Sequence, residues 1–352
     1  MCPIKNDKPI SVVMSVYNSQ EYLSASIESI LNQTHEAFDF IIIDDGSFDR
    51  SLEIIQGYAK ADNRIRIIVN RSNLGIALSL NKGIKIAKGK YIARMDADDV
   101  CLPERFEIQL DYLEKNPNIW ILGSSIIYID EKGNYIRQIN YPADPNRLRW
   151  DMLFGTTGLV CHPSAMMLAD KIREAGLYTN LKASQDMDLW CRFFEIDPLP
   201  IYNLQIPLVK YRWHENNFSV THGTLQHQVS SEIRLNTINH AFKRDYDLKM
   251  VEAYRNFAPQ QNEYLKEDLI QYMTTWLEVL DDFKSMFKLS NSEVKDYYEQ
   301  ILYKMRNYTS LNPLALFNCH RVWLLELMPK IGFKRSIDLF VYKLKRLKLV
   351  KG

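Results

Sequence analysis

Short apolar runs and helical stripes alternate along the first hundred residues of the chain. The runs at 10–14, 40–43, 65–69 and 91–95 are typical of buried strands. The stripes between them comprise Leu23, Ile27, Ile30 and Leu31; Leu52, Ile55, Tyr58 and Ala59; and Ile76, Leu80, Ile84 and Ala87. Asn18 is a candidate N-cap for the first helix. Such alternation predicts an α/β fold whose mainly parallel sheet has helices on both faces.

The pattern loosens after the fourth strand. We predict a helix over 106–113, short strands near 119–122, 126–129 and 135–139, a helix starting near Ser184 and a strand over 206–212. The stretch 224–331 contains no glycine and carries long helical stripes, including one over 265–287. The sequence therefore predicts two regions, residues 1–222 and 223–352.

Composition narrows the class of protein. The 352 residues are 46% hydrophobic, which suits a large core and about two domains. The five cysteines are scattered and form no C-x-x-C pair, which disfavours disulfides or structural zinc and favours a cytoplasmic compartment. The first eight residues do not resemble a signal peptide, and no apolar run reaches the ~18 residues of a membrane span. A net charge of +1 disfavours nucleic acid as a partner.

The basic residues gather at the C-terminal end. Residues 334–352 hold seven Lys or Arg residues against Asp338. In this tail, Ile337, Phe340, Val341, Leu344 and Leu347 recur at helical spacing. This pattern fits a basic amphipathic helix on an anionic membrane, and equally a packed terminal helix with a solvated basic face.

Polar residues follow each predicted strand, where the carboxyl ends of parallel strands form one crevice. They are Ser15-Val16-Tyr17-Asn18, Asp44-Asp45-Gly46-Ser47, Asn70-Arg71-Ser72-Asn73 and Asp96-Ala97-Asp98-Asp99. Three carboxylates after a buried strand repel one another unless a cation or several donors compensate them. The last cluster therefore predicts a divalent-metal site. The alternative is a solvated loop in which Asp99 caps the following helix.

Other nucleotide-binding motifs are missing from these turns. Strand one is followed by Val16-Tyr17-Asn18-Ser19 rather than G-x-G-x-x-G, and no Walker motif occurs, which disfavours a dehydrogenase or a P-loop enzyme. Asp44-Asp45 suits a partner for a ribose or a base, but Asp-Gly-Ser is also ordinary turn chemistry.

Taken together, the motifs resemble family-2 glycosyltransferases of the GT-A fold, in particular bacterial enzymes of surface-polysaccharide assembly. The resemblance covers residues 10–105. It rests on Val13-x-Ser15-x-Tyr17-Asn18, Leu31-x-Gln33-Thr34, Asp44-Asp45-Gly46-Ser47-x-Asp49, Asn73-x-Gly75, Lys88-Gly89-x-Tyr91-Ile92 and Met95-Asp96-Ala97-Asp98-Asp99. It implies a catalytic region over 1–222, with a nucleotide-sugar part to about residue 105 and an acceptor part after it, and a helical accessory region over 223–352.

The resemblance also implies roles for single residues. The base and ribose would be held by Ser15, Val16, Tyr17, Asn18, Asp45, Asn73, Asp96 and Ala97. Asp98 would ligate Mn²⁺ or Mg²⁺ on the diphosphate, and His214 would complete that site. Oxygen ligands and bridged phosphates suit either ion.

A general base is expected in Ser184-Gln185-Asp186-Met187-Asp188-Leu189-Trp190, which is similar to the Glu-Asp-x-x-Leu-Trp segment of the family. Helical spacing puts Asp186 on the buried face with Trp190 and Asp188 on the solvated one, so we predict Asp186 as the base. Gln185 stands where the family usually has glutamate, which puts acceptor contacts there in doubt. Together with His162, Gln185 and Trp190 are expected to line the acceptor pocket.

The resemblance implies an inverting, metal-dependent transferase. Its donor would be a nucleotide sugar, most simply a UDP-sugar, and its acceptor a hydroxyl of a glycan or lipid-linked glycan in polysaccharide or lipopolysaccharide synthesis. Two alternatives stay open. One is a metal-dependent phosphohydrolase or nucleotidyltransferase that uses the same carboxylates, and the other is an inactive sugar-nucleotide-binding scaffold.

Overall fold

A computed structural model describes residues 8–155, 158–197, 200–215, 217–255, 266–294 and 297. The chain divides into two compact units, Met1–Thr237 and Ile238–Gly352. The boundary predicted near Gly223 falls at the start of helix α9 (Gly223–Phe242), and the division between the units lies further along this helix. The basic tail over 334–352 lies outside the described residues.

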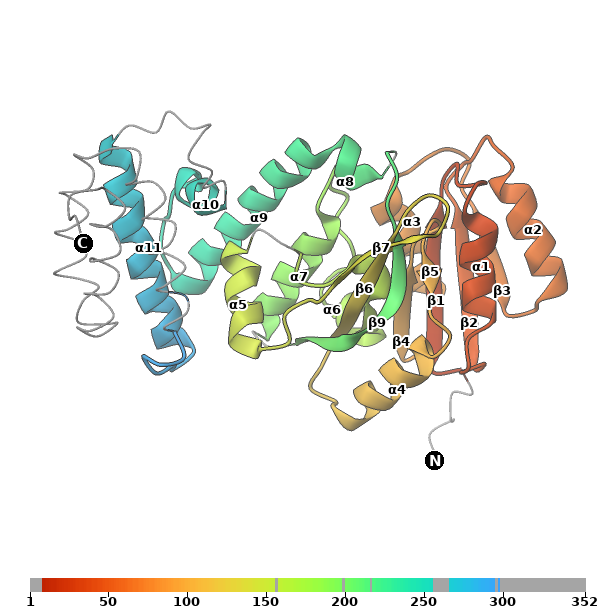
Figure 1. Ribbon diagram of the computed structural model, residues 1–352, viewed down its shortest axis with the longest axis horizontal. Helices are drawn as coiled ribbons and strands as arrows, with labels where there is room; N and C mark the ends of the chain where they lie inside the picture. The colour runs from red at the N-terminus through yellow and green to blue at the C-terminus, as the bar shows by residue number, and fades with distance from the viewer. Residues whose placement is uncertain are drawn as a thin grey trace, which may run out of the picture. The chain divides into compact units, whose positions relative to one another are not determined.

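The first part of the chain alternates strands and helices as predicted (Figure 1). Its elements are β1 (Ile10–Val16), α1 (Leu23–Leu31), β2 (Phe38–Asp44), α2 (Ser51–Ala61), β3 (Ile65–Val69), α3 (Ile76–Ile86) and β4 (Tyr91–Met95). The strands pair in parallel in the order β3-β2-β1-β4. Their carboxyl ends therefore meet at one edge, which is where the predicted polar clusters lie.

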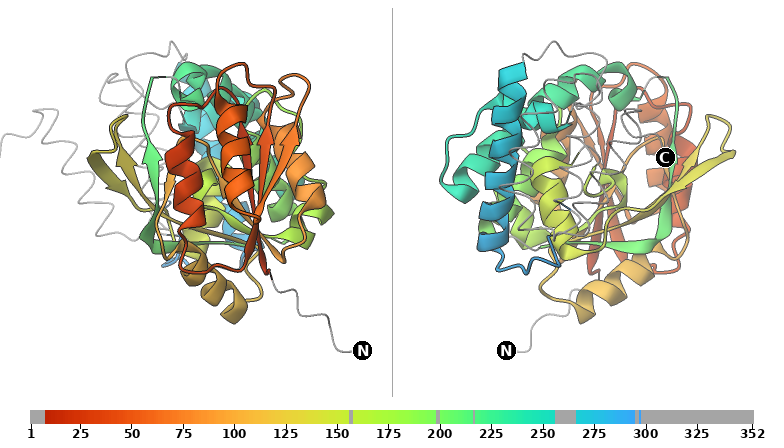
Figure 2. Two further views of the ribbon diagram at one scale, coloured as in Figure 1. Left: turned by 90° about the vertical axis from the view of Figure 1, so that its right-hand side faces the viewer. Right: turned by 60° about the vertical axis from the view of Figure 1, so that its left-hand side comes forward.

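Helices cover both faces of these parallel strands (Figure 2). On one face, Val12 and Met14 of β1 pack with Ile27 of α1 in the main core. On the other face, α3 approaches so closely that a Cβ on Gly83 would lie 2.6 Å from Val13 Cγ1. Successive apolar side chains of β1 thus pack into cores on opposite faces of the sheet.

The next part of the chain extends the sheet with mixed pairing. Its elements are β5 (Val100–Cys101), α4 (Arg105–Lys115), β6 (Ile121–Ile129), β7 (Tyr135–Ile139), α5 (Pro145–Phe154), the 3₁₀ turn η1 (His162–Ser164), β8 (Met166–Leu168), α6 (Ala169–Glu174), α7 (Gln185–Ile196), β9 (Ile201–Arg212) and α8 (Phe218–Thr221). The sheet continues from β4 as β8-β6-β9-β5, with β7 on β6. β8 lies antiparallel between β4 and β6, and β9 is parallel to β6.

Two strand predictions in this part need correction. The strands predicted near 119–122 and 126–129 are two parts of the single strand β6, which begins at Ile121. Ser124 and Ser125 in its middle are fully buried, and the Ser125 hydroxyl donates to the Leu204 carbonyl at 3.4 Å. These polar residues interrupt the apolar pattern of the strand, although they find hydrogen-bond partners inside the sheet. β9 also begins at Ile201, before the predicted residue 206.

The second unit is helical over the residues that the structure describes. It holds α10 (Leu248–Arg255) and α11 (Lys266–Met286). In α11, Trp276, Leu280 and Phe283 of the predicted stripe are buried, and the Trp276 indole donates to the Met250 carbonyl at 3.1 Å. No helix among the described residues is long and apolar enough to cross a membrane.

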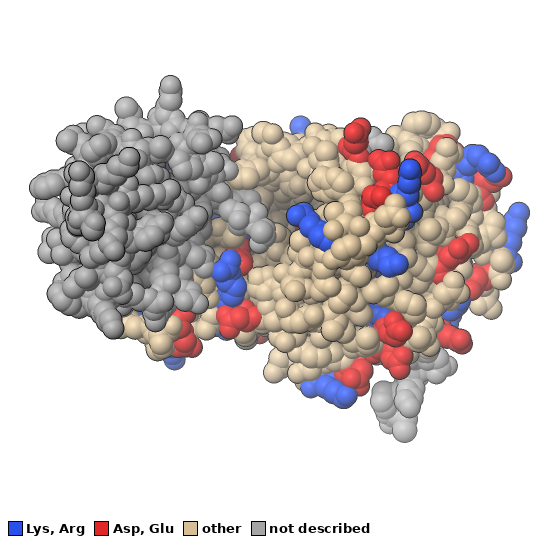
Figure 3. Space-filling model, viewed as in Figure 1, with Lys and Arg blue, Asp and Glu red and all other residues tan. Residues whose placement is uncertain are grey.

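Charges are mixed over the described surface seen in Figure 3. Lys and Arg side chains lie among Asp and Glu side chains, with broad uncharged areas between them. On this face, neither the basic nor the acidic side chains form a patch that extends over all the described residues.

Candidate active site

The acidic loop after β4 gathers three carboxylates. Oxygens of Asp96, Asp98 and Asp99 lie within 4.8 Å of one another. Asp96 forms an ion pair with the buried Arg94 of β4. Burial raises the pKa of Asp96, and that of Asp99 rises well above the ordinary value, first by burial and then by the neighbouring carboxylates. This loop therefore holds negative charge at an energetic cost, as expected of a cation site.

Asp99 does not cap the following helix, so that prediction is wrong. Helix α4 begins after Glu104 without any side-chain cap. The Asp99 side chain is 1% exposed, and its Oδ1 accepts a hydrogen bond from the Arg212 backbone N–H at 2.8 Å. Its Oδ2 is buried and has no hydrogen-bond partner among the residues that the structure describes. Asp99 thus ties the acidic loop to the end of β9.

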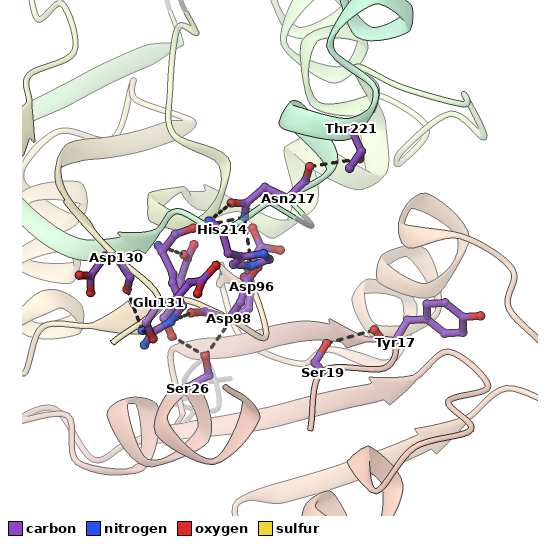
Figure 4. Close-up of polar contacts among 12 residues, drawn as sticks. Tyr17, Ser19, Ser26, Asp96, Asp98, Asp130, Glu131, His214, Asn217 and Thr221 are labelled. Atoms are coloured by element: carbon purple, nitrogen blue, oxygen red, sulfur yellow. Dashed lines mark hydrogen bonds and ion pairs between the residues drawn. The ribbon is translucent and has the colours of Figure 1, made fainter. Parts of the chain in front are cut away.

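The segment after β9 brings His214 to the acidic loop (Figure 4). His214 Nε2 lies 3.0 Å from Asp98 Oδ2. Tyr22 stacks on the His214 ring with centroids 5.3 Å apart, and Asn217 Oδ1 accepts from the His214 backbone N–H at 2.6 Å. Two residues that are 116 positions apart therefore meet with the imidazole orientation fixed from two sides.

The residues present fit a divalent cation. Neighbouring ligands of an octahedral ion with bonds of about 2.1 Å lie about 3 Å apart, which matches the separation of Asp98 and His214. Asp99 adds a buried carboxylate oxygen without a protein partner nearby. Carboxylate oxygens with one imidazole form a donor set suited to Mn²⁺ or Mg²⁺.

The loop after β1 carries the residues predicted to hold the nucleotide. Ser15 is half-buried, and the Val16 carbonyl accepts from the Asp45 N–H at 2.7 Å. The Tyr17 ring is 44% exposed, lies edge-on to Phe48, and is separated from His214 in Figure 4.

Asn18 does not cap α1, contrary to prediction. The N-cap residue is Tyr22, and Asn18 adopts a left-handed conformation with φ of 49°. Its Oδ1 accepts instead from the Phe48 N–H at 3.0 Å, and its own N–H donates to the Ser47 hydroxyl at 3.1 Å. Asn18 therefore fastens the loop after β1 to the loop after β2.

Asp45 is buried and organises the loop after β3. Its Oδ1 accepts from Asn70 Nδ2 at 2.7 Å and from the Leu74 N–H at 2.9 Å, while its Oδ2 accepts from the Gly75 N–H at 2.9 Å. Asn73 is exposed in the same loop. The methyl group of Ala97 is buried in the main core, so its backbone is the part available to a ligand.

Asp186 lies in the first turn of α7. Its carboxyl is half-buried, and burial raises its pKa. The charge of Asp186 also contributes to the raised pKa of Asp96, so the two carboxylates lie within electrostatic range. Asp188 instead pairs with Arg192 at 2.8 Å. The two aspartates of this segment thus have different environments.

Comparisons with known proteins agree with this arrangement. Residues 11–176 match the model of the family described as glycosyl transferase family 2. The chain is 41% identical over 215 residues to an uncharacterized glycosyltransferase, MJ1057, of Methanocaldococcus jannaschii, which covers 58% of this chain and 71% of the relative. It is 34% identical over 211 residues to the O-antigen biosynthesis glycosyltransferase WbnJ of Escherichia coli, with 59% and 81% covered. The chain belongs to glycosyltransferase family 2.

Solved structures confirm the GT-A fold of this glycosyltransferase. The S. aureus TarS 1–349 complex with UDP-GlcNAc gives a TM-score of 0.56 at 15% identity, with 86% of this chain and 91% of TarS covered. The mannosyltransferase PcManGT of Pyrobaculum calidifontis, in complex with GDP-Man and Mn²⁺, gives 0.50 at 10% identity, with 95% and 85% covered.

The residues predicted on the acceptor side of the glycosyltransferase differ in exposure. His162 is buried, and its Nε2 lies 2.7 Å from the Tyr178 hydroxyl. Burial, aided by the charge of Arg94, lowers its pKa well below the ordinary value, so the imidazole is neutral. Trp190 is 1% exposed and packs edge-on to His162, so its ring lies in the core beside this histidine. Gln185 is half-buried at the start of α7.

Three site residues were not predicted from the sequence. Arg94 pairs with Asp96. Arg212 donates from Nε to the Asp98 carbonyl at 2.9 Å, and its guanidinium lies over the Tyr22 ring at 4.6 Å. A signal for Arg94 was available, because it interrupts an apolar strand directly before the acidic cluster, and Arg212 ends a strand two residues before His214. Tyr22 lacked any such signal.

Proposed function

We propose that this glycosyltransferase transfers a sugar from a UDP-sugar to a hydroxyl of a glycan or lipid-linked glycan, with metal dependence and inversion at the anomeric carbon. The meeting of Asp98 and His214 at 3.0 Å carries the proposal. The assignment of a nucleotide sugar is supported by TarS and PcManGT, which bind UDP-GlcNAc and GDP-Man. A role in bacterial surface-polysaccharide or lipopolysaccharide assembly is supported by WbnJ, named for O-antigen biosynthesis.

Asp98 and His214 would hold Mn²⁺ or Mg²⁺. When bound, such an ion neutralises charge on a departing diphosphate. Asp96, held by Arg94, would orient the ribose or the sugar, and the Tyr17 loop with Asp45 would position the base. Each of these residues binds or orients the donor without taking part in proton transfer.

Asp186 would act as the general base. The acceptor oxygen forms its bond to the anomeric carbon as the bond to the diphosphate breaks, and the acceptor proton passes to the Asp186 carboxylate. A carboxyl whose pKa is raised is a stronger base than an ordinary aspartate. The rate should therefore fall as the pH is lowered and Asp186 becomes protonated. This fall should occur at a pH above the range in which an ordinary aspartate titrates.

The test measures nucleoside diphosphate release from a panel of UDP-, GDP- and dTDP-sugars, with Mn²⁺ and with EDTA, and with glycan and lipid-linked acceptors. One UDP-sugar should support release that needs the metal. Asp98→Asn should abolish metal dependence and lower the rate by about 10²-fold or more, and Asp186→Asn should lower kcat by a similar factor while the donor still binds.

Asp188→Asn is the matched control. It removes the same charge from the same helix, where Asp188 only pairs with Arg192, so activity should stay near that of the wild type. Acceptor-independent cleavage of the donor to a phosphorylated sugar would favour the phosphohydrolase alternative. Donor binding by calorimetry without turnover on any acceptor would favour the scaffold. Activity that survives Asp186→Asn would refute the assigned base.

A further inference from the structure

An aromatic face lies on one side of the strands β7, β6 and β9. We define it by Tyr128, Arg137, Tyr211 and Trp213. Tyr128 of β6 is paired in register with Arg137 of β7 and with Tyr211 of β9, so these three side chains share a face. Trp213 directly follows the end of β9.

Contacts between the side chains confirm this arrangement. The Tyr128 ring lies 5.0 Å from the Tyr211 ring and 6.0 Å from the Trp213 ring, measured between centroids. The Arg137 guanidinium sits 5.0 Å above the centre of the Tyr128 ring. The rings and the cation therefore form one continuous surface that crosses three strands.

Exposure increases along the aromatic face. Its base, formed by Ile126, Cys161 and Val209, is buried. At the rim, Trp213 is 44% exposed and Arg137 is exposed. Both views of Figure 2 show β7 at the margin of the described part. Exposed aromatic groups on a rigid sheet are typical of interaction sites.

The aromatic face is continuous with the candidate active site. Trp213 directly precedes His214, and Cys161 at the base directly precedes His162. The pKa of Tyr128 and of Tyr211 is raised, chiefly by burial and in part by the charge of Asp99. The tyrosines in the middle of the face thus lie within electrostatic range of the acidic loop.

We propose that the aromatic face binds the acceptor glycan and leads its reacting hydroxyl toward Asp186. Aromatic rings offer an apolar surface to the C–H faces of sugar rings, while tyrosine hydroxyls and Arg137 supply hydrogen bonds to sugar hydroxyls. A glycan suits the face better than a bilayer does, since Trp213 directly precedes His214 and the tyrosines lie within electrostatic range of Asp99. This inference rests on the proposed function and extends it by naming the acceptor surface.

The test measures the binding of N-acetylchitotriose, mannotriose and cellotriose by saturation-transfer NMR and fluorescence titration, with UDP and Mn²⁺ present. At least one trisaccharide should bind the wild type with a Kd on the order of millimolar or tighter. Trp213→Ala and Arg137→Ala should each weaken that binding about tenfold, and Trp213→Phe should restore most of it. Arg137 is exposed and distant in sequence from His214, so its loss reports on the surface alone.

Gln138→Ala is the control, because Gln138 is exposed on the same strand and is paired with Ile127, which places it on the opposite face. It should change binding less than twofold. The inference is overturned if no trisaccharide binds, if Gln138→Ala weakens binding as much as Arg137→Ala, or if Trp213→Ala instead abolishes sedimentation with anionic liposomes. UDP binding is measured separately in each variant, so a wild type that fails to bind UDP would refute the proposed function rather than the acceptor surface.

Discussion

The two halves of the first compact unit bring their strands together in different ways. Over residues 10–105, β1 pairs with β2 and β2 with β3, each one helix away along the chain, and β4 then pairs with the free side of β1. Over 106–222, β8 enters between β4 and β6 in the opposite direction, and Ile121 of β6 pairs with Ile201 of β9. In the first half the strands can be predicted from the local apolar pattern, whereas in the second half the strand pairing depends on partners that are distant in sequence.

The candidate site lies where these halves meet. Asp98 and Asp99 end the first half, while Arg212 and His214 end the last strand of the second. The first half supplies the three carboxylates of the acidic loop, and the second half supplies the imidazole of His214. The contacts across this junction should therefore affect stability and metal affinity together.

The largest expected effect follows from Arg212→Ala. The side chain is 6% exposed and its guanidinium donates to the carbonyls of Asp98, Asp130 and Glu131 at 2.9–3.1 Å. Its loss leaves these carbonyls without that donor and should lower the free energy of unfolding by about 3–5 kcal/mol. Chemical denaturation measures this, and Mn²⁺ titration should show weaker binding.

Arg50→Ala controls for the loss of an arginine. Arg50 is exposed in the first half and pairs only with Glu53, so its denaturation midpoint should match that of the wild type. If Arg212→Ala unfolded at the same midpoint as Arg50→Ala, the junction would not be a stabilising element.

The same contrast explains how far the sequence could predict the fold. The four parallel strands and their helices were predicted because each buries its own apolar pattern. β5 and β8 were missed, since two or three residues are too few to show a period and their pairing depends on β9, β4 and β6.

The residue types of the site could be predicted from the sequence, but the hydrogen bonds between them could not. The acidic loop, His214 and Asp186 were recognisable from motifs. The hydrogen bond of Asp99 to the Arg212 backbone depends on where β9 ends, 113 residues later, and no local pattern encodes it. Likewise, the donors around Asp45 come from the loop after β3, which folds back onto it.

A smaller effect should separate two helical glycines in the first half. A Cβ on Gly83 of α3 would lie 2.6 Å from Val13 Cγ1 and 2.8 Å from Ile43 Cδ1, whereas a Cβ on Gly57 of α2 would meet nothing within 4 Å. Gly83→Ala should destabilise by about 1–3 kcal/mol through overpacking. Gly57→Ala should stabilise by about 0.5–1 kcal/mol through helix propensity.

Thermal unfolding of the two alanine variants distinguishes packing from propensity. If α3 is held against the sheet as closely as the structure indicates, Gly83→Ala should lower the melting temperature and Gly57→Ala should raise it. A gain in stability from Gly83→Ala would show that α3 can move away from β1 and β2 at little cost.

Asp99→Asn should produce the smallest change in stability, and the size of this change depends on pH. The pKa of Asp99 in the folded protein is raised well above the ordinary aspartate value by burial and by the neighbouring carboxylates, so between the ordinary and the raised pKa folded Asp99 keeps a proton that the unfolded chain has lost. Stability therefore falls as pH rises through that window. Asparagine carries no charge and keeps an oxygen for the Arg212 N–H, so the metal-free variant should be more stable than the wild type at neutral pH.

This advantage should shrink toward zero as pH falls to the ordinary aspartate range, because wild-type Asp99 is then protonated in both states. Added Mn²⁺ should reduce it at neutral pH, since the cation offsets repulsion among the carboxylates of the wild type. Asp111→Asn, which removes an exposed carboxylate paired with Lys115, should show neither dependence. If Asp99→Asn were equally stabilising at every pH, the charge of Asp99 would not be the cause of the difference in stability. The difference would then have to come from packing at the junction of the two halves.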